Sequence, residues 1–295
     1  MKVTVLGGSG FLGSHVADHL TRGGHDVTIF DRDVSRWLGS GQSMIVGDIK
    51  DLAHVVEATR GSEVVYNFAA IADLDEARSN PIESALINVI GNLNALEASR
   101  IHSVKRFVLA SSLYVNSVAG SFYRCSKQSA EHYVEEYWRE FALPYTILRF
   151  GSLYGPRSGA GNGLRQIIRG ALTNGRVRYA GSPDATREYI HVEDAASAAT
   201  QVLDEHFANR SVMLSGQQSI RVDDLLATIC EMLQIPPSSA EFVEVEDVGR
   251  YVRTPYSHHS QISKKLVPTE YVDFGLGLLE LIRDVEQELN DSLDG

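Results

Sequence analysis

The chain has 295 residues and a formal net charge of −11, a length that accommodates one large α/β domain or two unequal domains. The acidic balance argues against a nucleic-acid-binding protein but permits an anionic small molecule held by a local positive cluster. No apolar run is long enough to cross a bilayer, so no membrane partner is expected. Two widely separated cysteines and the lack of a leader before the first apolar run predict a cytoplasmic protein.

Short β-branched apolar runs alternate with segments of helical spacing over the first half of the chain. The first run, Lys2–Leu6, predicts a buried parallel strand, and Phe11–Arg22 follows as a helix that ends at Gly23-Gly24. Further strands are expected at 27–30, 44–46, 64–68, 106–109, 145–148 and 212–214. Further helices are expected at 53–58, 81–99, 123–141, 164–173 and 192–206. This alternation predicts an α/β fold with a Rossmann-like doubly wound parallel sheet.

The alternation loosens after Gly155, which suggests a second, smaller domain. Residues 222–294 are predicted to be mostly helical, with a break at Pro236-Pro237. We expect a dinucleotide-binding domain over 1–155, with sheet-covering returns near 183–215. A smaller C-terminal substrate-binding cap would comprise 156–182 and 216–295.

A glycine-rich stretch, GGSGFLG at residues 7–13, lies between the first strand and the first helix. Gly7 would allow a tight turn, Gly10 would let a pyrophosphate reach the backbone, and Gly13 would let the helix pack closely on the strand. The helix N-terminus would then face the phosphates. Asp31, 18 residues beyond Gly13, is placed to bind the adenosine ribose hydroxyls, which favours NAD over NADP. The neighbouring Arg32 weakens that preference.

Two later stretches carry candidate catalytic groups. A strand ends in Ser111-Ser112, and Tyr123 and Lys127 follow at a spacing that puts both on one helix face. A free tyrosine, with a pKa of about 10, is a poor base at neutral pH. A nearby lysine cation favours the phenolate, so Tyr123 could act as a general acid and base while Ser112 binds the same substrate oxygen.

These motifs, in this order, resemble those of the extended short-chain dehydrogenase/reductase family, the NAD-dependent nucleotide-sugar epimerases and dehydratases. The resemblance extends over nearly the whole chain. It rests on GGSGFLG, Gly47-Asp48-Ile49, Phe68-Ala69-Ala70, Asn88-Val89-Ile90-Gly91, Ala110-Ser111-Ser112, Tyr123 with Lys127, and the stretches 148–156 and 187–194.

The resemblance implies a role for each matched position. Ser112, Tyr123 and Lys127 would be catalytic, with Lys127 also on the nicotinamide ribose. Cofactor contacts are expected from Gly7, Gly10, Phe11, Leu12, Gly13, Asp31, Arg32, Asp48, Ile49, Phe68, Ala69, Ala70, Asn88, Tyr123, Lys127 and Phe150. Substrate contacts are expected from Ser111, Ser112, Ser152, Arg187 and Arg253, with Arg187 on the substrate diphosphate.

Three departures from the family pattern concern the sugar rather than the redox groups. Only the eight residues 115–122 follow Tyr114 before Tyr123, a shorter loop than usual. Ser152 stands where many relatives have asparagine, and Asn92 where threonine is common.

The choice of reaction depends on the residues that follow Ser112. The 4,6-dehydratases of the family carry a Thr-Asp-Glu pattern where this chain has Ser112-Leu113-Tyr114. No acid beside Ser112 could eliminate water, which counts against dehydration. Reductases of the family use NADPH, which Asp31 disfavours. We therefore expect a UDP-hexose 4-epimerase that uses NAD, a nucleotide sugar as substrate and transient oxidation at carbon 4. The alternatives are another NAD-dependent oxidoreductase or dehydratase of the family, or a non-enzymatic NAD sensor.

Three further features concern metal binding, a cysteine and the oligomeric state. The adjacent His258 and His259 are not accompanied by an acid or cysteine cluster, so no metal site is expected. Cys125, inside the Tyr-Lys motif, is expected to pack on the buried side of its helix. In relatives the helix 81–99 and the tyrosine helix form a dimer interface, so the resemblance implies a homodimer.

Overall fold

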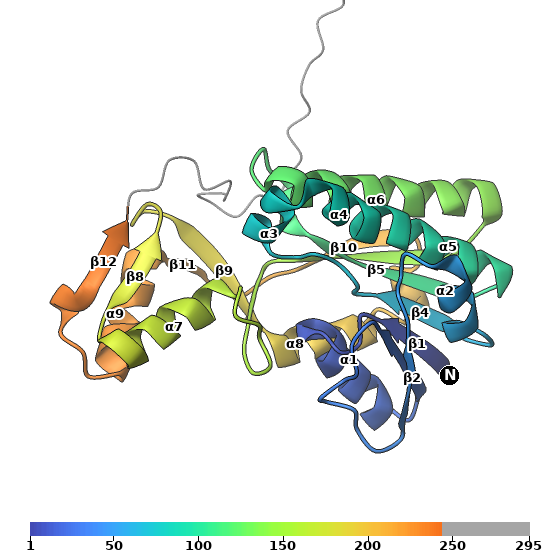
Figure 1. Cartoon of the computed structure of the whole chain (residues 1–295), viewed down its shortest axis with the longest axis horizontal. Coiled ribbons are helices and arrows are strands. Elements are labelled where there is room, and N and C mark those ends of the chain that lie inside the picture. The colour runs from blue at the N-terminus through green and yellow to red at the C-terminus, as the bar shows by residue number, and fades with distance from the viewer. Residues whose placement is uncertain (244–295) are drawn as a thin grey trace, which may run out of the picture. The chain divides into compact units, whose positions relative to one another are not determined.

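The computed structural model describes residues 1–243, which lie in one compact unit. Within them, seven parallel strands form the main sheet in the order β10-β6-β5-β4-β1-β2-β3 (Figure 1). Their bounds are β1 Lys2–Leu6, β2 Asp26–Asp31, β3 Gln42–Val46, β4 Val64–Asn67, β5 Arg106–Ser112, β6 Tyr145–Phe150 and β10 Arg210–Leu214. The strand order reverses between β1 and β4, so their carboxyl ends flank the crevice where doubly wound sheets bind ligands. The Rossmann-like α/β fold is confirmed.

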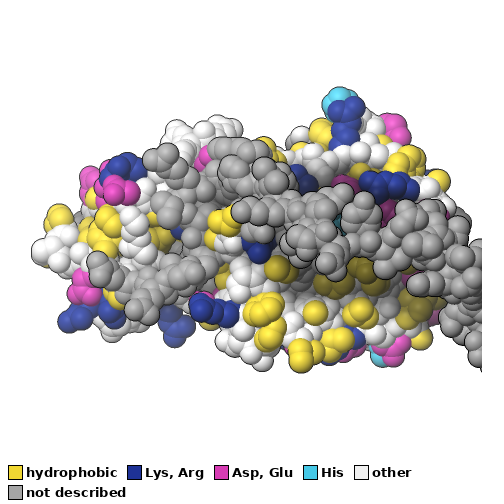
Figure 2. Space-filling model, turned by 90° about the horizontal axis from the view of Figure 1, so that it is seen from above, with side chains coloured by type: hydrophobic (Ala, Val, Ile, Leu, Met, Phe, Trp, Pro, Cys, Tyr) yellow, Lys and Arg dark blue, Asp and Glu magenta, His cyan; other side chains and the backbone are white. Residues whose placement is uncertain are grey.

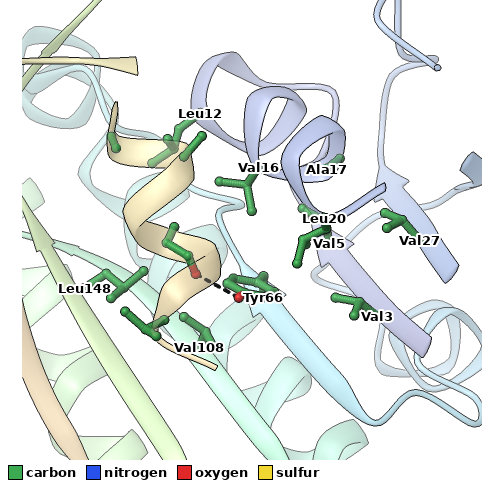
Figure 3. Packing of buried hydrophobic residues seen from close by; sticks show 14 of the residues in the cluster. Val3, Val5, Leu12, Val16, Ala17, Leu20, Val27, Tyr66, Val108 and Leu148 are labelled. Atoms are coloured by element: carbon green, nitrogen blue, oxygen red, sulfur yellow. Dashed lines mark hydrogen bonds between the residues drawn. The ribbon is translucent and has the colours of Figure 1, made fainter. Parts of the chain in front are cut away.

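Helices cover both faces of this sheet (Figure 1). One layer consists of α1 Phe11–Arg22 and α8 Val192–Gln201; the other includes α2 Leu52–Ala58, α5 Gly91–Ile101 and α6 Ser121–Phe141. Figure 3 shows the core under α1 and α8, where the buried hydroxyl of Tyr66 donates a hydrogen bond to the carbonyl oxygen of Ala199 at 2.8 Å. Burial raises the pKa of Tyr66, which keeps this phenol neutral.

The helix expected over 81–99 is present but interrupted. It consists of α4 Pro81–Ala85, a π-helical turn η1 Leu86–Ile90, and then α5. A π turn inserts one residue into the helical ladder, which apolar spacing alone does not reveal, and such turns occur often at functional sites. The short helix α3 Leu74–Ser79 precedes it and was not predicted. The helix expected over 192–206 ends at Gln201 and is followed by the 3₁₀ turn η3 Glu205–Phe207.

Apart from α8 and β10, the described segments beyond β6 form two small sheets, and a separate hydrophobic core lies among α7, β8 and α9. One sheet has the order β11-β9-β7, and the other pairs β12 with β8. Their bounds are β7 Ser152–Tyr154, β8 Val177–Ala180, β9 Thr186–His191, β11 Ser219–Arg221 and β12 Ala240–Val243. Helices α7 Gly163–Asn174 and α9 Val222–Met232 pack with β8 around this core (Figure 1).

The expectation for the C-terminal part was wrong in one place. Residues 240–243 are a strand, not helix, and the short turn η4 Pro237–Ser239 precedes it. These strands have three to six residues, and each needs a partner distant in sequence, so their local pattern carries little signal. The rest of the predicted helical stretch lies outside the described residues, and the proposed domain boundaries stay a prediction. No helix within residues 1–243 has the length and apolarity to span a bilayer.

Candidate active site

The glycine loop joins β1 to α1 at the crevice. Gly7 has a φ of +77°, and a Cβ there would lie 2.5 Å from the backbone nitrogen of Ala69, so a larger residue cannot be accommodated. A Cβ on Gly13 would lie 2.3 Å from the carbonyl oxygen of Gly7. Gly13 therefore permits close packing of α1 on the loop itself, rather than on the strand as expected.

The start of α1 suits an anionic group. Its N-cap is Gly10, and no side chain in the described part of the chain caps it. The N–H groups of the first turn therefore remain available to a ligand, and the positive end of the helix dipole adds to the attraction. These features fit the diphosphate of a dinucleotide.

Asp31 ends β2 beside this loop. Its carboxylate accepts a hydrogen bond from the backbone N–H of Ser9 at 3.0 Å, which fixes the acid against the glycine loop. Arg32 projects outward, with 73% of its side chain exposed, and pairs with Asp33 at 3.2 Å. The arginine is thus engaged away from Asp31, and the position of the acid fits ribose hydroxyls.

The two residues expected beside adenine differ in their exposure. Asp48 accepts a hydrogen bond from the N–H of Lys50 at 2.9 Å and stays partly exposed. Ile49 is buried, and its side chain occupies the space where a Cβ of Gly91 would be. Contact of either residue with adenine stays a prediction.

A cavity of about 1210 Å³ begins at the glycine loop and continues toward α7, β8 and β9. It brings together most of the expected site residues: Gly7, Gly10, Phe11, Leu12, Gly13, Phe68, Ala70, Ser111, Ser112, Tyr123, Lys127, Phe150, Ser152 and Arg187. Asp31, Arg32, Asp48, Ile49, Ala69 and Asn88 are not part of its lining. Arg253, like His258 and His259, lies outside the described residues.

Tyr123 and Lys127 lie on the first turns of α6. The ammonium nitrogen of Lys127 is 5.9 Å from the centroid of the Tyr123 ring and donates a hydrogen bond to the carbonyl oxygen of Ala110 at 2.8 Å. Lys127 is 4% exposed, and this burial lowers its pKa to about 8, although the carboxylate of Glu131 opposes the shift. A cation held this close to a phenol favours the phenolate, as general acid–base work by Tyr123 requires.

The two serines at the end of β5 make different hydrogen bonds. Ser112 lines the cavity, and its Oγ accepts the N–H of Tyr114 at 3.3 Å, capping the 3₁₀ turn η2 Leu113–Asn116. Ser111 donates its hydroxyl to buried Glu131 at 2.5 Å. Glu131 also receives a two-pronged ion pair from Arg149, at 3.0 and 2.6 Å. This engagement of Ser111 favours a supporting role over the substrate contact that the resemblance implies.

Asn88 lies in the π-helical turn, outside the cavity lining, and bonds to two segments next to the site. Its side-chain oxygen accepts the N–H of Ile71 at 2.8 Å, and its amide donates to the carbonyl oxygen of Ile71 at 3.0 Å and to the hydroxyl of Ser126 at 2.9 Å. The amide thus links the segment after β4 to α6. Asn92, one turn on, accepts a hydrogen bond from the amide of Asn67 at 3.0 Å.

The far end of the cavity contains several cations. Arg187 on β9 is buried and donates to the hydroxyl of Tyr179 at 3.0 Å. Arg176 and Arg178, beside and in β8, also line the cavity and were not predicted, because no motif marks them. Arg178 is held by Glu241 at 3.2 Å. A cluster of guanidinium groups suits phosphate oxygens.

Other lining residues were also missed, and one expectation was wrong. Tyr114 and Asp73 both line the cavity; Asp73 is its one carboxylate among the described residues, and its Oδ1 caps α3. Cys125 is exposed rather than packed inside, because Tyr123, Ser126 and Lys127 occupy the buried face of α6. Residues 1–243 contain no group of three or more His, Cys, Asp or Glu arranged to hold a metal ion.

A parallel sheet with a glycine loop, an acid after β2 and a Ser-Tyr-Lys set defines a dinucleotide-dependent enzyme of Rossmann type. The profile of the NAD dependent epimerase/dehydratase family matches residues 3–214. The chain belongs to this family, and its cofactor is NAD.

Similar proteins come from both branches of that family. A putative UDP-glucose 4-epimerase of Methanocaldococcus jannaschii is 29% identical, over 77% of this chain and 81% of its own. A dTDP-glucose 4,6-dehydratase of Mycobacterium tuberculosis is 24% identical, over 94% of this chain and 91% of its own. The crystal structure of a Thermotoga maritima UDP-glucose 4-epimerase with UDP-glucose superposes with a TM-score of 0.79 at 25% identity, covering 88% of this chain and 90% of that one.

Proposed function

We propose that this enzyme is a nucleotide-sugar epimerase that inverts carbon 4 of a UDP-hexose by transient oxidation. The observation that carries the proposal is the arrangement along one cavity. Tyr123, Lys127 and Ser112 lie at the end next to the glycine loop, and Arg176, Arg178 and Arg187 lie at the other. A sugar diphosphate has a reacting hydroxyl at one end and two phosphates at the other, and this distribution of groups complements it.

The chain's own residues would handle the proton. Tyr123 would take the proton of the sugar 4-hydroxyl and later return it, while the Ser112 hydroxyl binds the same oxygen. Lys127 would hold the phenolate by its charge, and its bond to Ala110 keeps the ammonium in place. When bound in the crevice at the glycine loop, NAD would supply reversible hydride chemistry at carbon 4, so that no cofactor would be consumed. The arginines would hold the diphosphate while the sugar turns in the cavity.

Dehydration is the second candidate because relatives from that branch match the chain and Asp73 lines the cavity. A dehydratase needs a carboxylate to eliminate water from the oxidised sugar. Here Leu113 and Tyr114 follow Ser112, and the Oδ1 atom of Asp73 already accepts two N–H groups of α3, each at 2.9 Å. This engagement favours epimerisation.

The test is proton NMR of the purified protein with NAD and a panel of UDP-hexoses. We expect the carbon-4 epimer to appear without accumulation of NADH, and Tyr123→Phe to lower the rate at least about 100-fold. Tyr133→Phe is the matched control, since Tyr133 is an exposed tyrosine of the same helix. A keto-deoxy sugar formed with loss of water would establish the dehydratase instead, and full turnover by Tyr123→Phe would disprove the mechanism.

The assembly that we propose is a homodimer through α4, η1 and α6. Large apolar side chains are exposed along these elements, among them Ile82, Ile90, Phe122, Trp138 and Phe141. Figure 2 looks down on the molecule from the top of Figure 1, and the part drawn in colour shows hydrophobic side chains among polar ones. A second copy would cover them. Light scattering coupled to gel filtration should give twice the chain mass of 32.4 kDa, and a monomer at micromolar concentration would contradict the proposal.

A further inference from the structure

The short segment between Ser112 and Tyr123 folds back onto the helix that carries the tyrosine. After η2, Gly120 adopts a left-handed conformation with a φ of +102° and caps α6. From α6, the Gln128 amide donates a hydrogen bond to the carbonyl oxygen of Val115 at 2.9 Å. Arg124 donates to the carbonyl oxygen of Ser117 at 3.3 Å. The segment is therefore fastened to the same helix turns that place the catalytic groups.

This fold packs the ring of Tyr114 against two neighbours. One is Gly120, where a Cβ would lie 2.6 Å from Cδ1 and 3.0 Å from Cγ of the ring, so only glycine leaves room for it. The ring also meets that of Tyr123 edge to face, with centroids 6.3 Å apart at 79°. Leu74 joins both rings in one apolar cluster. The Tyr114 ring cannot move toward Gly120 without displacing backbone.

The position of this ring constrains the sugar. Tyr114 lines the cavity beside Tyr123, and the phenol of Tyr123 must reach the 4-hydroxyl. A ring in contact with Tyr123 then stands next to the carbons that flank carbon 4. An aromatic face packs well on the C–H groups of a sugar and resists a bulky or charged substituent.

We propose that Tyr114, held by Gly120, is a specificity-determining residue that disfavours a charged group on the sugar's carbon 5. Carbon 5 is the neighbouring carbon whose substituent varies most among UDP-sugars, from hydrogen to a hydroxymethyl group to a carboxylate. This inference rests on the proposed function, because it takes the sugar to be bound with its 4-hydroxyl at Tyr123.

The experiment is calorimetric binding of three UDP-sugars that differ at carbon 5 to the NAD-loaded protein. UDP-xylose carries hydrogen there, UDP-glucose a hydroxymethyl group and UDP-glucuronic acid a carboxylate. For the wild type we expect UDP-xylose and UDP-glucose to bind within about threefold of each other, and UDP-glucuronic acid to bind at least about tenfold more weakly. Tyr114→Ala should compress the differences to less than about threefold by strengthening UDP-glucuronic acid. Tyr114→Phe keeps the ring and should retain the wild-type spread.

The variants also separate this proposal from the proposed function. NAD affinity, measured alongside, should be the same in all three proteins, which shows that they are folded. If Tyr114→Ala keeps the wild-type order and spread, the role of Tyr114 is overturned while the proposed function stands. If no UDP-sugar binds the wild type, the proposed function itself fails, and the role of Tyr114 fails with it.

Discussion

Lys127 is a buried charge in the candidate active site, and its replacement should show how much that burial costs in unfolding free energy. The ammonium is 4% exposed, and its pKa is lowered from 10.5 to about 8, chiefly by burial. This difference corresponds to about 3 kcal/mol of unfolding free energy at neutral pH. Lys127→Met removes the charge and keeps most of the volume, but leaves the carbonyl oxygen of Ala110 without this donor, at a cost of about 1 kcal/mol. The variant should be more stable at pH 7 by about 2 kcal/mol.

The pH dependence has a definite sign. Below pH 8 the lysine carries its proton in both states, so the full penalty weakens the native state. Between pH 8 and 10.5 the native state releases the proton before the unfolded chain does, and the stability of the wild type rises. The advantage of Lys127→Met should therefore shrink across this interval.

Urea unfolding followed by circular dichroism, at pH 7 and again near pH 10, measures both effects. Lys105→Met is the control, because Lys105 is 72% exposed and its pairing with Glu63 at 2.8 Å is worth little. It should change the unfolding free energy by less than about 0.5 kcal/mol. Turnover by Lys127→Met should fall at least about 100-fold. A variant less stable than the wild type at pH 7, or an advantage that does not change with pH, would show that burial of the Lys127 charge does not weaken the native state.

Two further predictions concern the helix α1. Gly13→Ala would place a methyl group 2.3 Å from a carbonyl oxygen of the glycine loop, so NAD affinity in a fluorescence titration should fall at least about tenfold. Gly163→Ala is the control, because a Cβ there has no atom within 4 Å, and it should bind NAD as the wild type does. Equal NAD affinities for the two variants would contradict a close fit of NAD against the glycine loop. Glu193 accepts hydrogen bonds from His19 and His15, each at 2.7 Å, and its pKa is lowered to about 2, chiefly by His19. Because its side chain is 44% exposed, Glu193→Gln should lower the unfolding free energy by at most about 1 kcal/mol at neutral pH. A depressed carboxyl pKa stabilises the native state above pH 4.5, so this loss should vanish as the pH falls toward 2, and a constant difference in urea midpoints would contradict it.

Sequence patterns predicted correctly the features that depend on near neighbours in the chain. An apolar run, a glycine loop and a helix follow one another directly in residues 2–22, and the structure confirms the bounds of both the strand and the helix. Tyr123 and Lys127 share a face because helical residues four apart do so in any helix.

Contacts between distant segments could not be predicted in the same way. The amide of Asn88 bonds to Ile71 and Ser126, and the hydroxyl of Ser111 bonds to Glu131. These partners meet only once the sheet and helices have packed. The motif match predicts ligand contacts for both residues, which stay predictions, and it gave no sign of these hydrogen bonds between elements.

Local sequence patterns were enough to predict the parallel sheet, the dinucleotide loop and the candidate acid–base pair, because each depends on spacings within one or two consecutive elements. The shape and charge of the rest of the cavity depend instead on packing between segments that are distant in the chain. Arg176 and Arg178 line the same cavity as Tyr123 and Lys127, and the ring of Tyr114 packs against Gly120. Such contacts arise from the packing of surfaces that carry no periodic signal, so they follow from the fold rather than from local sequence.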